Sequence, residues 1–255
     1  MVNLKIEEVN DDLRFAYKFA ASRITSSASV IDFGCGGGYG TEYLSRFTRN
    51  EVVGFDLDVD TINQNREFFK NINNLTFVSD EAKLRRYDVV VFFQVIEHLK
   101  RESIPLCLEK LKNLLNDSGT IYLATVNKNI SSYELKKPIL PFHIYEFNPR
   151  ELSDLLSKYL HGVKCYGQID QKLAKKVCSG EWSYSKYYDL GFRNKLIRII
   201  SQIELVRFIA RHMPLFIKSF ILGYGNTKPK RVNFKLTDVP LEIENSYILI
   251  YEGKK

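Results

Sequence analysis

Short apolar runs alternate with amphipathic segments along the first half of the chain. A continuous apolar run over 87–93 is typical of a central strand that is buried on both faces of a parallel sheet. Between the runs, apolar residues recur at helical spacing, as Leu13, Ala16 and Tyr17 do within 10–24. This alternation predicts an α/β fold with a doubly wound parallel sheet. The predicted strands are 29–33, 51–56, 75–78, 87–93, 120–125, 162–167 and 246–251, and the predicted helices are 10–24, 41–47, 61–70, 104–115 and 149–159.

A glycine-rich loop follows the first predicted strand. Asp32 lies at the end of the apolar run and a helix is predicted from Thr41, so the loop opens onto a helix N-terminus whose N–H groups face a ligand. The G-x-G-x-x-G dinucleotide fingerprint does not fit, because its last glycine falls on Tyr39 or Thr41 in the two registers. The spacing G-x-G-x-G behind an acid fits a nucleoside without a pyrophosphate, and an ordinary glycine turn is the alternative. The loop contains Gly34, Cys35, Gly36 and Gly38.

Acidic residues follow the second predicted strand. Asp56 lies 20 residues after Gly36, where this fold brings a carboxylate to the hydroxyls of a ribose. Both hydroxyls can donate to one carboxylate, which favours Asp or Glu at this position. Leu57 could form a wall against the adenine face, and Asp58 and Asp60 are expected to cap the next helix.

The charge of the chain is unevenly placed, which bears on its partners. The net charge is +7, yet residues 1–100 carry 12 Lys and Arg against 15 Asp and Glu, whereas 170–255 carry 16 against 8. The basic excess therefore lies outside the half of the chain that contains the glycine-rich loop. It could serve an anionic substrate, a membrane surface or solubility. The four cysteines lack a C-x-x-C or paired spacing, so reduced thiols in a cytoplasmic protein are expected. Neither a signal peptide nor a membrane-spanning apolar run is found.

A basic, helical insertion is predicted over 170–240, before the last strand of a single domain that spans 1–255. An apolar stripe at helical spacing within it predicts an amphipathic helix with basic residues on its other faces. Such a helix either packs on the sheet as a substrate lid or contacts a membrane surface peripherally through 195–211. The stripe comprises Leu196, Ile199, Ile200, Ile203 and Val206.

Two histidines are expected near the strand ends at which an open parallel sheet binds its ligands. Glu97 and His98 come shortly after strand 87–93, and His143 lies in a loop rich in Pro and Phe. If a hydroxyl is the acceptor it must lose a proton, and His143 is then the preferred general base, with His98 the second candidate. Glu97 is a third catalytic candidate, although fixing the loop or cofactor geometry is its more frequent role. For each histidine the alternative is a structural role, in orienting a loop or capping a helix.

With these motifs placed, residues 12–168 resemble the class I S-adenosylmethionine (SAM) methyltransferases. Segments of one subgroup recur at 38–40, 95–99, 125–128, 141–147 and 166–168. That subgroup resembles enzymes of surface polysaccharide or glycolipid biosynthesis, and 96–98 with 127–128 is more distantly similar to the ubiquinone-biosynthesis O-methyltransferases. The resemblance implies a Rossmann-like sheet of seven strands in the order 3-2-1-4-5-7-6, with the last strand antiparallel. It also implies SAM as the methyl donor and S-adenosylhomocysteine (SAH) as the product.

The resemblance implies a cofactor site with Asp80 on the adenine amino group. Ala16 stands where the subgroup usually carries Arg, and Arg14 is the candidate to replace that Arg in holding the methionine carboxylate of SAM. Tyr87 stands where the family often has Phe. Relatives that bind a metal have Glu at the position of Gln94, so no metal is expected here. A divalent ion on Glu97, His98 and His143 is the alternative. The implied cofactor-binding residues are Tyr17, Asp32, Gly34, Cys35, Gly36, Gly38, Asp56, Leu57, Asp80, Glu81 and Gln94.

Three functions remain open for the chain. The leading hypothesis is O-methylation of a small-molecule hydroxyl or of a sugar hydroxyl on a lipid- or nucleotide-linked glycan, in polysaccharide biosynthesis. The second is methylation of a polyprenylated phenol at the membrane surface. The third is a SAM-binding regulator without catalysis. Nucleic acid is not expected as a partner, because no N/D-P-P-Y/F motif is present and basic charge alone is a weak signal.

Overall fold

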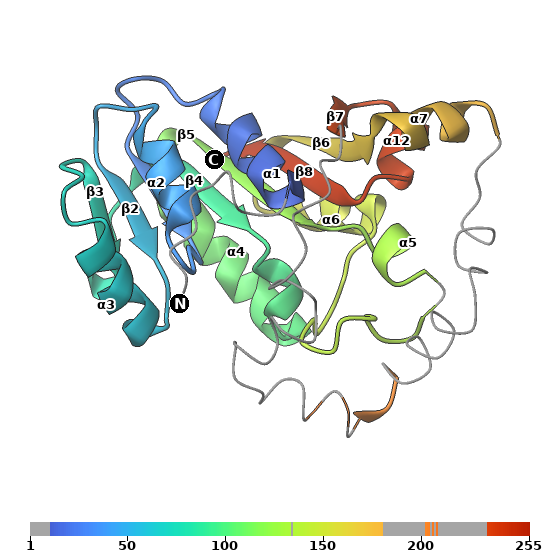
Figure 1. Ribbon diagram of the computed structural model, residues 1–255, viewed down its shortest axis with the longest axis horizontal. Helices are drawn as coiled ribbons and strands as arrows, with labels where there is room; N and C mark the ends of the chain where they lie inside the picture. The colour runs from blue at the N-terminus through green and yellow to red at the C-terminus, as the bar shows by residue number, and fades with distance from the viewer. Residues whose placement is uncertain (1–10, 134, 181–201, 205, 207, 209–233) are drawn as a thin grey trace.

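The structure is a computed structural model that describes residues 11–133, 135–180, 202–204, 206, 208 and 234–255. Its centre is an eight-stranded sheet in the order β3-β2-β1-β4-β5-β8-β6-β7 (Figure 1). The strands are β1 (Val30–Phe33), β2 (Val52–Phe55), β3 (Leu75–Val78), β4 (Tyr87–Phe93), β5 (Leu115–Val126), β6 (His161–Asp170), β7 (Phe234–Thr237) and β8 (Ile248–Lys254). The helices are α1 (Asp11–Ala21), α2 (Tyr39–Ser45), α3 (Val59–Phe68), α4 (Ile104–Asn113), α5 (Lys128–Ser131), α6 (Pro149–Leu156), α7 (Gln171–Cys178) and α12 (Pro240–Glu244), with short 3₁₀ turns η2 (Glu81–Lys83), η3 (Ile96–His98) and η4 (Arg101–Ser103).

The predicted α/β sheet is confirmed, including the reversal of its final strand. β3, β2, β1, β4 and β5 pair in parallel, whereas β8 pairs antiparallel with both β5 and β6. Strand order reverses between β1 and β4, because β2 and β3 extend the sheet on one side and the later strands extend it on the other. At such a switch point the loops after two neighbouring strands diverge and leave a crevice for a ligand.

The expected count of seven strands is wrong by one. Phe234–Thr237 forms β7, which pairs antiparallel with the end of β6 from Gly167↔Thr237 to Asp170↔Phe234. β6 continues to Asp170, beyond its expected end at Gly167, and its free edge offers unpaired backbone groups that a further strand satisfies. The segment 170–240 therefore contains a strand as well as α7 and the start of α12. Most of the predicted amphipathic helix at 195–211 lies outside the described residues.

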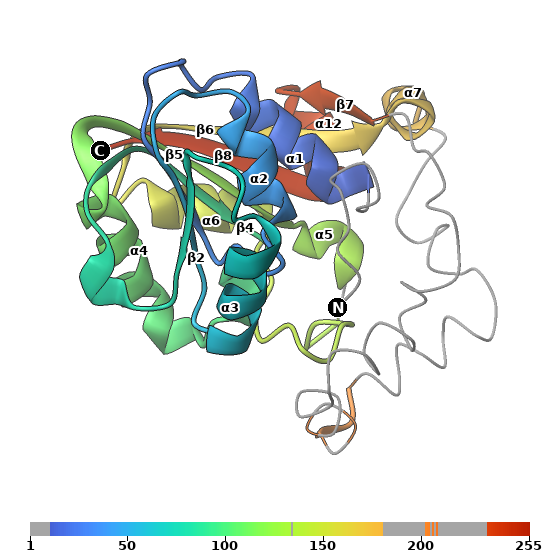
Figure 2. The same cartoon turned by 60° about the vertical axis from the view of Figure 1, so that its left-hand side comes forward.

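Two apolar layers hold helices against opposite faces of the sheet (Figures 1 and 2). On one face, Ala16, Ala20 and Leu44 from α1 and α2 pack on the strands. On the other, α4 and α6 pack through residues such as Leu111 and Leu152. Each fully buried leucine of these layers contributes about 1.5–3 kcal/mol to folding. In the part of the chain that the structure describes, no helix has both the length and the apolar character needed to cross a bilayer, and all four cysteines are free.

Gly40 in α2 allows α1 to approach closely. A Cβ at position 40 would lie 1.9 Å from Cζ of Tyr17, whose ring is buried and packs edge-on against Phe93 at a centroid distance of 5.0 Å. A side chain of any size at position 40 would therefore displace Tyr17.

We expect Gly40→Ala to lower the free energy of unfolding by about 2–4 kcal/mol, because the new methyl group overpacks the contact with Tyr17. Alanine in place of glycine ordinarily stabilises a helix interior by up to about 1 kcal/mol, so the contact reverses the usual sign. Urea unfolding measures the change. Gly37→Ala is the control, since the nearest atom to its Cβ is 3.8 Å away. Equal losses in both variants would contradict the proposed contact.

Candidate functional site

The glycine loop connects β1 to α2 at the switch point. Gly34 and Gly38 have φ angles of +86° and +75°, which side chains rarely tolerate. A Cβ on Gly34 would lie 2.4 Å from Val95, and Gly38 is the N-cap residue of α2 without a side-chain cap. The first N–H groups of α2 are therefore available to a ligand in the crevice.

Asp56 lies beside this loop, as its spacing predicts. Its Oδ2 accepts a hydrogen bond from the Gly36 N–H at 2.9 Å, and its Oδ1 accepts one from the Asp58 N–H at 3.0 Å. The carboxylate thus sits at the end of β2, directly across from the loop. Leu57 follows with 73% of its surface exposed, which is unusual for a leucine and leaves it available to pack on an apolar ligand.

The two acids after β3 have different surroundings. Asp80 is exposed and caps η2 through a hydrogen bond from the Ala82 N–H at 3.0 Å. Glu81 is exposed and forms an ion pair with Lys110 of α4 at 2.5 Å. Asp80 therefore has the better placement for a ligand in the crevice, and the role of Glu81 in cofactor binding stays a prediction.

Asp32 forms a buried network behind the loop. Its Oδ2 accepts hydrogen bonds from the hydroxyls of Tyr17 at 3.1 Å and Thr41 at 2.8 Å. Burial raises the pKa of the Asp32 carboxyl to about 7, even though both hydroxyl bonds oppose this, and burial raises the pKa of Tyr17 as well. Cys35 is also buried, in a cluster with Ile62 and Phe77. These side chains have their partners inside the protein, so they hold the loop in place.

Gln94 directly follows β4 and has a φ of +55°. It is the one residue other than glycine with a positive φ among those the structure describes, and its N–H donates to the Ala124 carbonyl at 2.8 Å. A left-handed conformation costs an ordinary residue about 1–2 kcal/mol and concentrates at functional sites. This strain supports the prediction that Gln94 borders the ligand.

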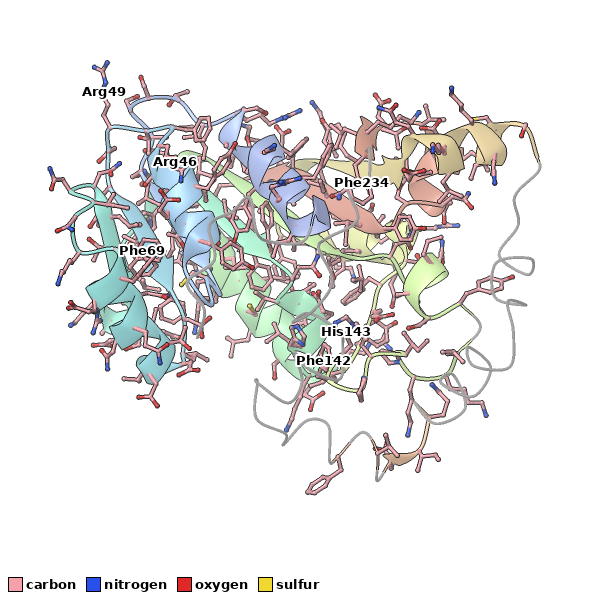
Figure 3. All side chains as sticks on the ribbon, viewed as in Figure 1. Arg46, Arg49, Phe69, Phe142, His143 and Phe234 are labelled. Atoms are coloured by element: carbon pink, nitrogen blue, oxygen red, sulfur yellow. The ribbon has the colours of Figure 1, made fainter. Side chains whose placement is uncertain are left out.

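The side chains of Glu97, His98 and His143 form one cluster near the ends of β4 and β5. One ligand atom from each lies within 4.8 Å of the others. Glu97 is completely buried and accepts a hydrogen bond from Thr125 Oγ1 at 2.9 Å, while its main-chain carbonyl accepts the Ile144 N–H at 2.7 Å. That bond fixes the loop of His143 against η3, so the three predicted catalytic candidates are indeed neighbours. Figure 3 shows His143 and Phe142 at this end of the molecule.

The cluster holds His143 in a defined orientation through Glu146, which the sequence analysis missed. His143 Nδ1 lies 2.6 Å from Glu146 Oε1, and both side chains are buried. The hydroxyls of Ser131 and Ser132 donate to Glu146 Oε2. Burial alone would raise the pKa of Glu146, but the hydrogen bonds from His143 and the two serines outweigh it and lower that pKa. The signal in the sequence is the spacing of three residues between His143 and Glu146.

The protonation states follow from these contacts. Glu146 is ionised at neutral pH, so His143 Nδ1 carries a proton toward it and Nε2 is left as the basic nitrogen. Burial raises the pKa of Glu97 to about 7, although the nearby His143 opposes the shift. The Oε1 atom of Glu97 has no hydrogen-bond partner. A buried, unsatisfied carboxylate oxygen costs about 1–3 kcal/mol or more, which indicates a position for a bound group.

His98 differs from its neighbour in being exposed. Its Nδ1 lies 3.3 Å from the Phe142 carbonyl, and its ring centroid is 5.0 Å from that of His143 in an edge-on arrangement. One carboxylate and two imidazoles are also a donor set that divalent metals accept. The expectation that no metal binds therefore stays a prediction.

Comparison with known proteins identifies the family of the chain. Residues 6–159 match the model of a family described as a methyltransferase domain. A probable S-adenosylmethionine-dependent methyltransferase of Mycobacterium tuberculosis is 32% identical over 142 residues, 55% of this chain and 50% of that protein. The mitochondrial ubiquinone biosynthesis O-methyltransferase of Candida albicans is 33% identical over 186 residues, 65% of this chain and 56% of that protein. Among solved structures, the YcgJ protein of Bacillus subtilis superposes with a TM-score of 0.54 at 12% identity, covering 94% of this chain and 98% of that one.

The α/β sheet is that of the class I SAM-dependent methyltransferases. The chain belongs to the methyltransferase-domain family, since the match covers more than half of it. It spans about half the length of the curated relatives it matches. The resemblance to a polysaccharide subgroup stays a prediction.

We expect Asp56→Ala to weaken SAH binding roughly 10- to 100-fold, because it removes the carboxylate placed for the ribose hydroxyls. Calorimetric titration of the purified protein with SAH measures this. Asp60→Ala is the matched control, since Asp60 lies in the first turn of α3 and its side chain is exposed. Unchanged affinity in Asp56→Ala would contradict the assigned position of the ribose.

We also expect the free energy of unfolding to fall as the pH rises from about 4 to about 7. The folded-state pKa of Asp32 is about 7, against 3.8 for an ordinary Asp. Below the lower value both states bind the proton, whereas between the two values only the folded state does, so stability is lost with rising pH. The loss from this group is on the order of 2 kcal/mol between about pH 5 and 7. Chemical unfolding at several pH values measures it, and an Asp32→Asn variant with an unchanged slope would show that Asp32 is not responsible.

Proposed function

We propose that the protein transfers the methyl group of SAM to a hydroxyl group of a small-molecule or glycan acceptor. The hydroxyl oxygen attacks the methyl carbon, the bond from that carbon to the sulfonium sulfur breaks, and the acceptor proton passes to His143 Nε2. The products are a methyl ether and SAH. The observation that carries the proposal is the buried pair of His143 and Glu146 at the end of the sheet where the cofactor crevice lies.

For the methyl donor, the site needs only to hold SAM in the correct position. A sulfonium is already a good leaving group, so the enzyme gains most by holding the methyl carbon in line with the acceptor oxygen. The loop from Gly34 to Gly38, Asp56 and Asp80 supply the contacts for the nucleoside, and the strained Gln94 directly follows β4, three residues before Glu97. Family membership supports SAM as the donor.

The acceptor side requires a base that is neutral before reaction and stable when charged. Glu146 orients the imidazole and stabilises its charged form, as a carboxylate does for the histidine of many general bases. Burial raises the pKa of Glu97 to about 7 and the nearby His143 opposes that shift, so a positive charge on His143 favours the ionised form of Glu97. Two carboxylates whose pKa values shift in opposite directions around one imidazole favour an acid–base role over a structural one.

A polyprenylated phenol is the second candidate acceptor. The observation in its favour is the likeness to the ubiquinone biosynthesis O-methyltransferase of Candida albicans. A phenol has a pKa near 10 and needs less help from a base than an alcohol does. Methyl transfer from labelled SAM to a panel of sugar nucleotides, lipid-linked glycans and prenylated phenols separates the two, and transfer to amines alone would overturn both.

We expect His143→Gln to lower kcat by roughly 10²- to 10⁴-fold while SAH affinity changes less than about twofold, because the change removes a base and no donor contact. Glu146→Gln is expected to reduce kcat by a smaller factor, because the imidazole keeps its place but loses the carboxylate that orients it and stabilises its charged form. His161→Gln is the control, since His161 is exposed at the start of β6. A His143→Gln variant with wild-type kcat would exclude His143 as the base.

A further inference from the structure

Gln202, in the segment 170–240, binds the backbone of the loop that leads to His143. Its Oε1 accepts a hydrogen bond from the Lys137 N–H at 3.0 Å, and its Nε2 donates one to the Lys137 carbonyl at 3.1 Å. The two residues are 65 positions apart in the chain. An amide side chain carries a donor and an acceptor side by side, as a peptide group does, so Gln202 pairs with Lys137 much as a neighbouring strand would.

Glu204 adds a second contact to the same place. Its carboxylate forms an ion pair with the Lys137 ammonium, and both side chains are largely exposed to solvent. An exposed ion pair contributes little, so the amide of Gln202, which is half-buried, is the stronger of the two contacts. Figure 1 draws 202–204 in orange, next to this loop.

The loop between Lys137 and His143 has limited conformational freedom. Pro138 and Pro141 each fix their own φ angle and restrict the residue before them to an extended conformation. The far end of the loop is held by the Ile144 N–H, which donates to the Glu97 carbonyl at 2.7 Å. Because the loop is stiff, the position of Lys137 limits where the residues that follow it can lie.

A chain of hydrogen bonds connects the loop to the imidazole of His143. The Ile139 N–H, two residues after Lys137, donates to Ser132 Oγ at 2.9 Å. Ser132 Oγ donates in turn to Glu146 Oε2 at 2.5 Å, and Glu146 Oε1 lies 2.6 Å from His143 Nδ1. Ser132, Glu146 and His143 are all buried.

The order of donors in this chain gives the loop its influence on Glu146. A serine hydroxyl has one proton to donate, and the Ile139 N–H can only donate to its oxygen. The bond from Ile139 therefore leaves the Ser132 proton directed at Glu146. If Ile139 moved away, the hydroxyl could turn toward other acceptors, and Glu146 would lose one of the bonds that hold it against His143.

We infer that Gln202 is a positioning residue for methyl transfer. By holding Lys137 it keeps Ile139 on Ser132, and so keeps the pair of Glu146 and His143 in the geometry that a general base requires. The inference rests on the proposed role of His143 as that base. The alternative is that Gln202 anchors only its own segment to the loop, in which case its loss leaves His143 unchanged.

NMR of the SAH-saturated protein, labelled with ¹⁵N-histidine, tests the inference without an acceptor. The chain has four histidines, and the signal that is missing in His143→Gln identifies the Nδ1–H of His143. We expect magnetisation transfer from water to show that this proton exchanges roughly 5- to 100-fold faster in Gln202→Leu, because the loop opens more often. We expect kcat for a hydroxyl acceptor to fall over the same range.

Two further variants separate positioning from a general loss of structure. Gln202→Glu keeps the length of the side chain and the acceptor for the Lys137 N–H, so both effects are expected to be smaller than in Gln202→Leu. Gln171→Leu removes an exposed amide at the start of α7 and is expected to behave like the wild type. SAH affinity and the unfolding temperature are expected to be unchanged in all three, since Gln202 contacts neither the glycine loop nor the sheet.

Unchanged proton exchange and unchanged kcat in Gln202→Leu would overturn the inference and leave the proposed function in place. Faster exchange that is accompanied by a fall in both SAH affinity and unfolding temperature would also overturn it, because Gln202 would then support the fold as a whole. The proposed function fails separately, if His143→Gln keeps the wild-type kcat, whatever the result for Gln202→Leu.

Discussion

One buried carboxylate connects the parts that the cofactor crevice depends on. Asp32 at the end of β1 accepts hydrogen bonds from Tyr17 of α1 and Thr41 of α2, so a single side chain ties the covering helix, the central strand and the helix behind the loop. The ring of Tyr17 in turn packs where Gly40 leaves space. The glycine loop between these elements has little freedom to move independently of them. The glycine loop is therefore supported from behind by side chains that hydrogen-bond to one another inside the protein.

Around His143, by contrast, the protein shifts the pKa values of the neighbouring carboxyl groups. Glu97 and Glu146 flank His143, yet burial raises the pKa of one while hydrogen bonds lower that of the other. The difference lies in their hydrogen bonds. Glu146 accepts hydrogen bonds from His143 and two serines, whereas one oxygen of Glu97 has no hydrogen-bond partner. An ionised Glu146 fixes the tautomer of His143. Hydrogen bonds to Asp32 support the glycine loop, whereas the surroundings of His143 shift the pKa values of Glu97 and Glu146.

Local sequence patterns predict most of the fold and the donor site. The bounds of β3 and β4 agree with the apolar runs, and Asn148 and Pro149 begin α6 as a polar cap followed by proline indicates. Asp56 lies by Gly36 because the spacing reflects one β-α-β unit of fixed size. Each of these features depends on residues close together in the chain or on a regular repeat, which is why the sequence is sufficient for them.

The remaining features depend on contacts between distant segments. β7 has four residues and pairs with a strand more than sixty positions earlier in the chain. A segment this short has no periodicity from which it could be predicted. The role of Glu146 becomes visible only once the loop of His143 folds back against η3. Propensity cannot report which polar groups are left unsatisfied, because satisfaction is a property of the assembled structure.

The pairing of β6 with β7 has a consequence for how this protein can diversify. The chain leaves the sheet after Asp170 and returns at Phe234, and these two residues are direct partners across the strands. A segment whose two ends are held this close adds little to the entropy of closing the loop as it lengthens, since each doubling costs only about 0.6 kcal/mol. Insertions and deletions between these ends therefore leave the sheet and the cofactor crevice almost untouched. The connection is a natural place for the exchange of segments between relatives.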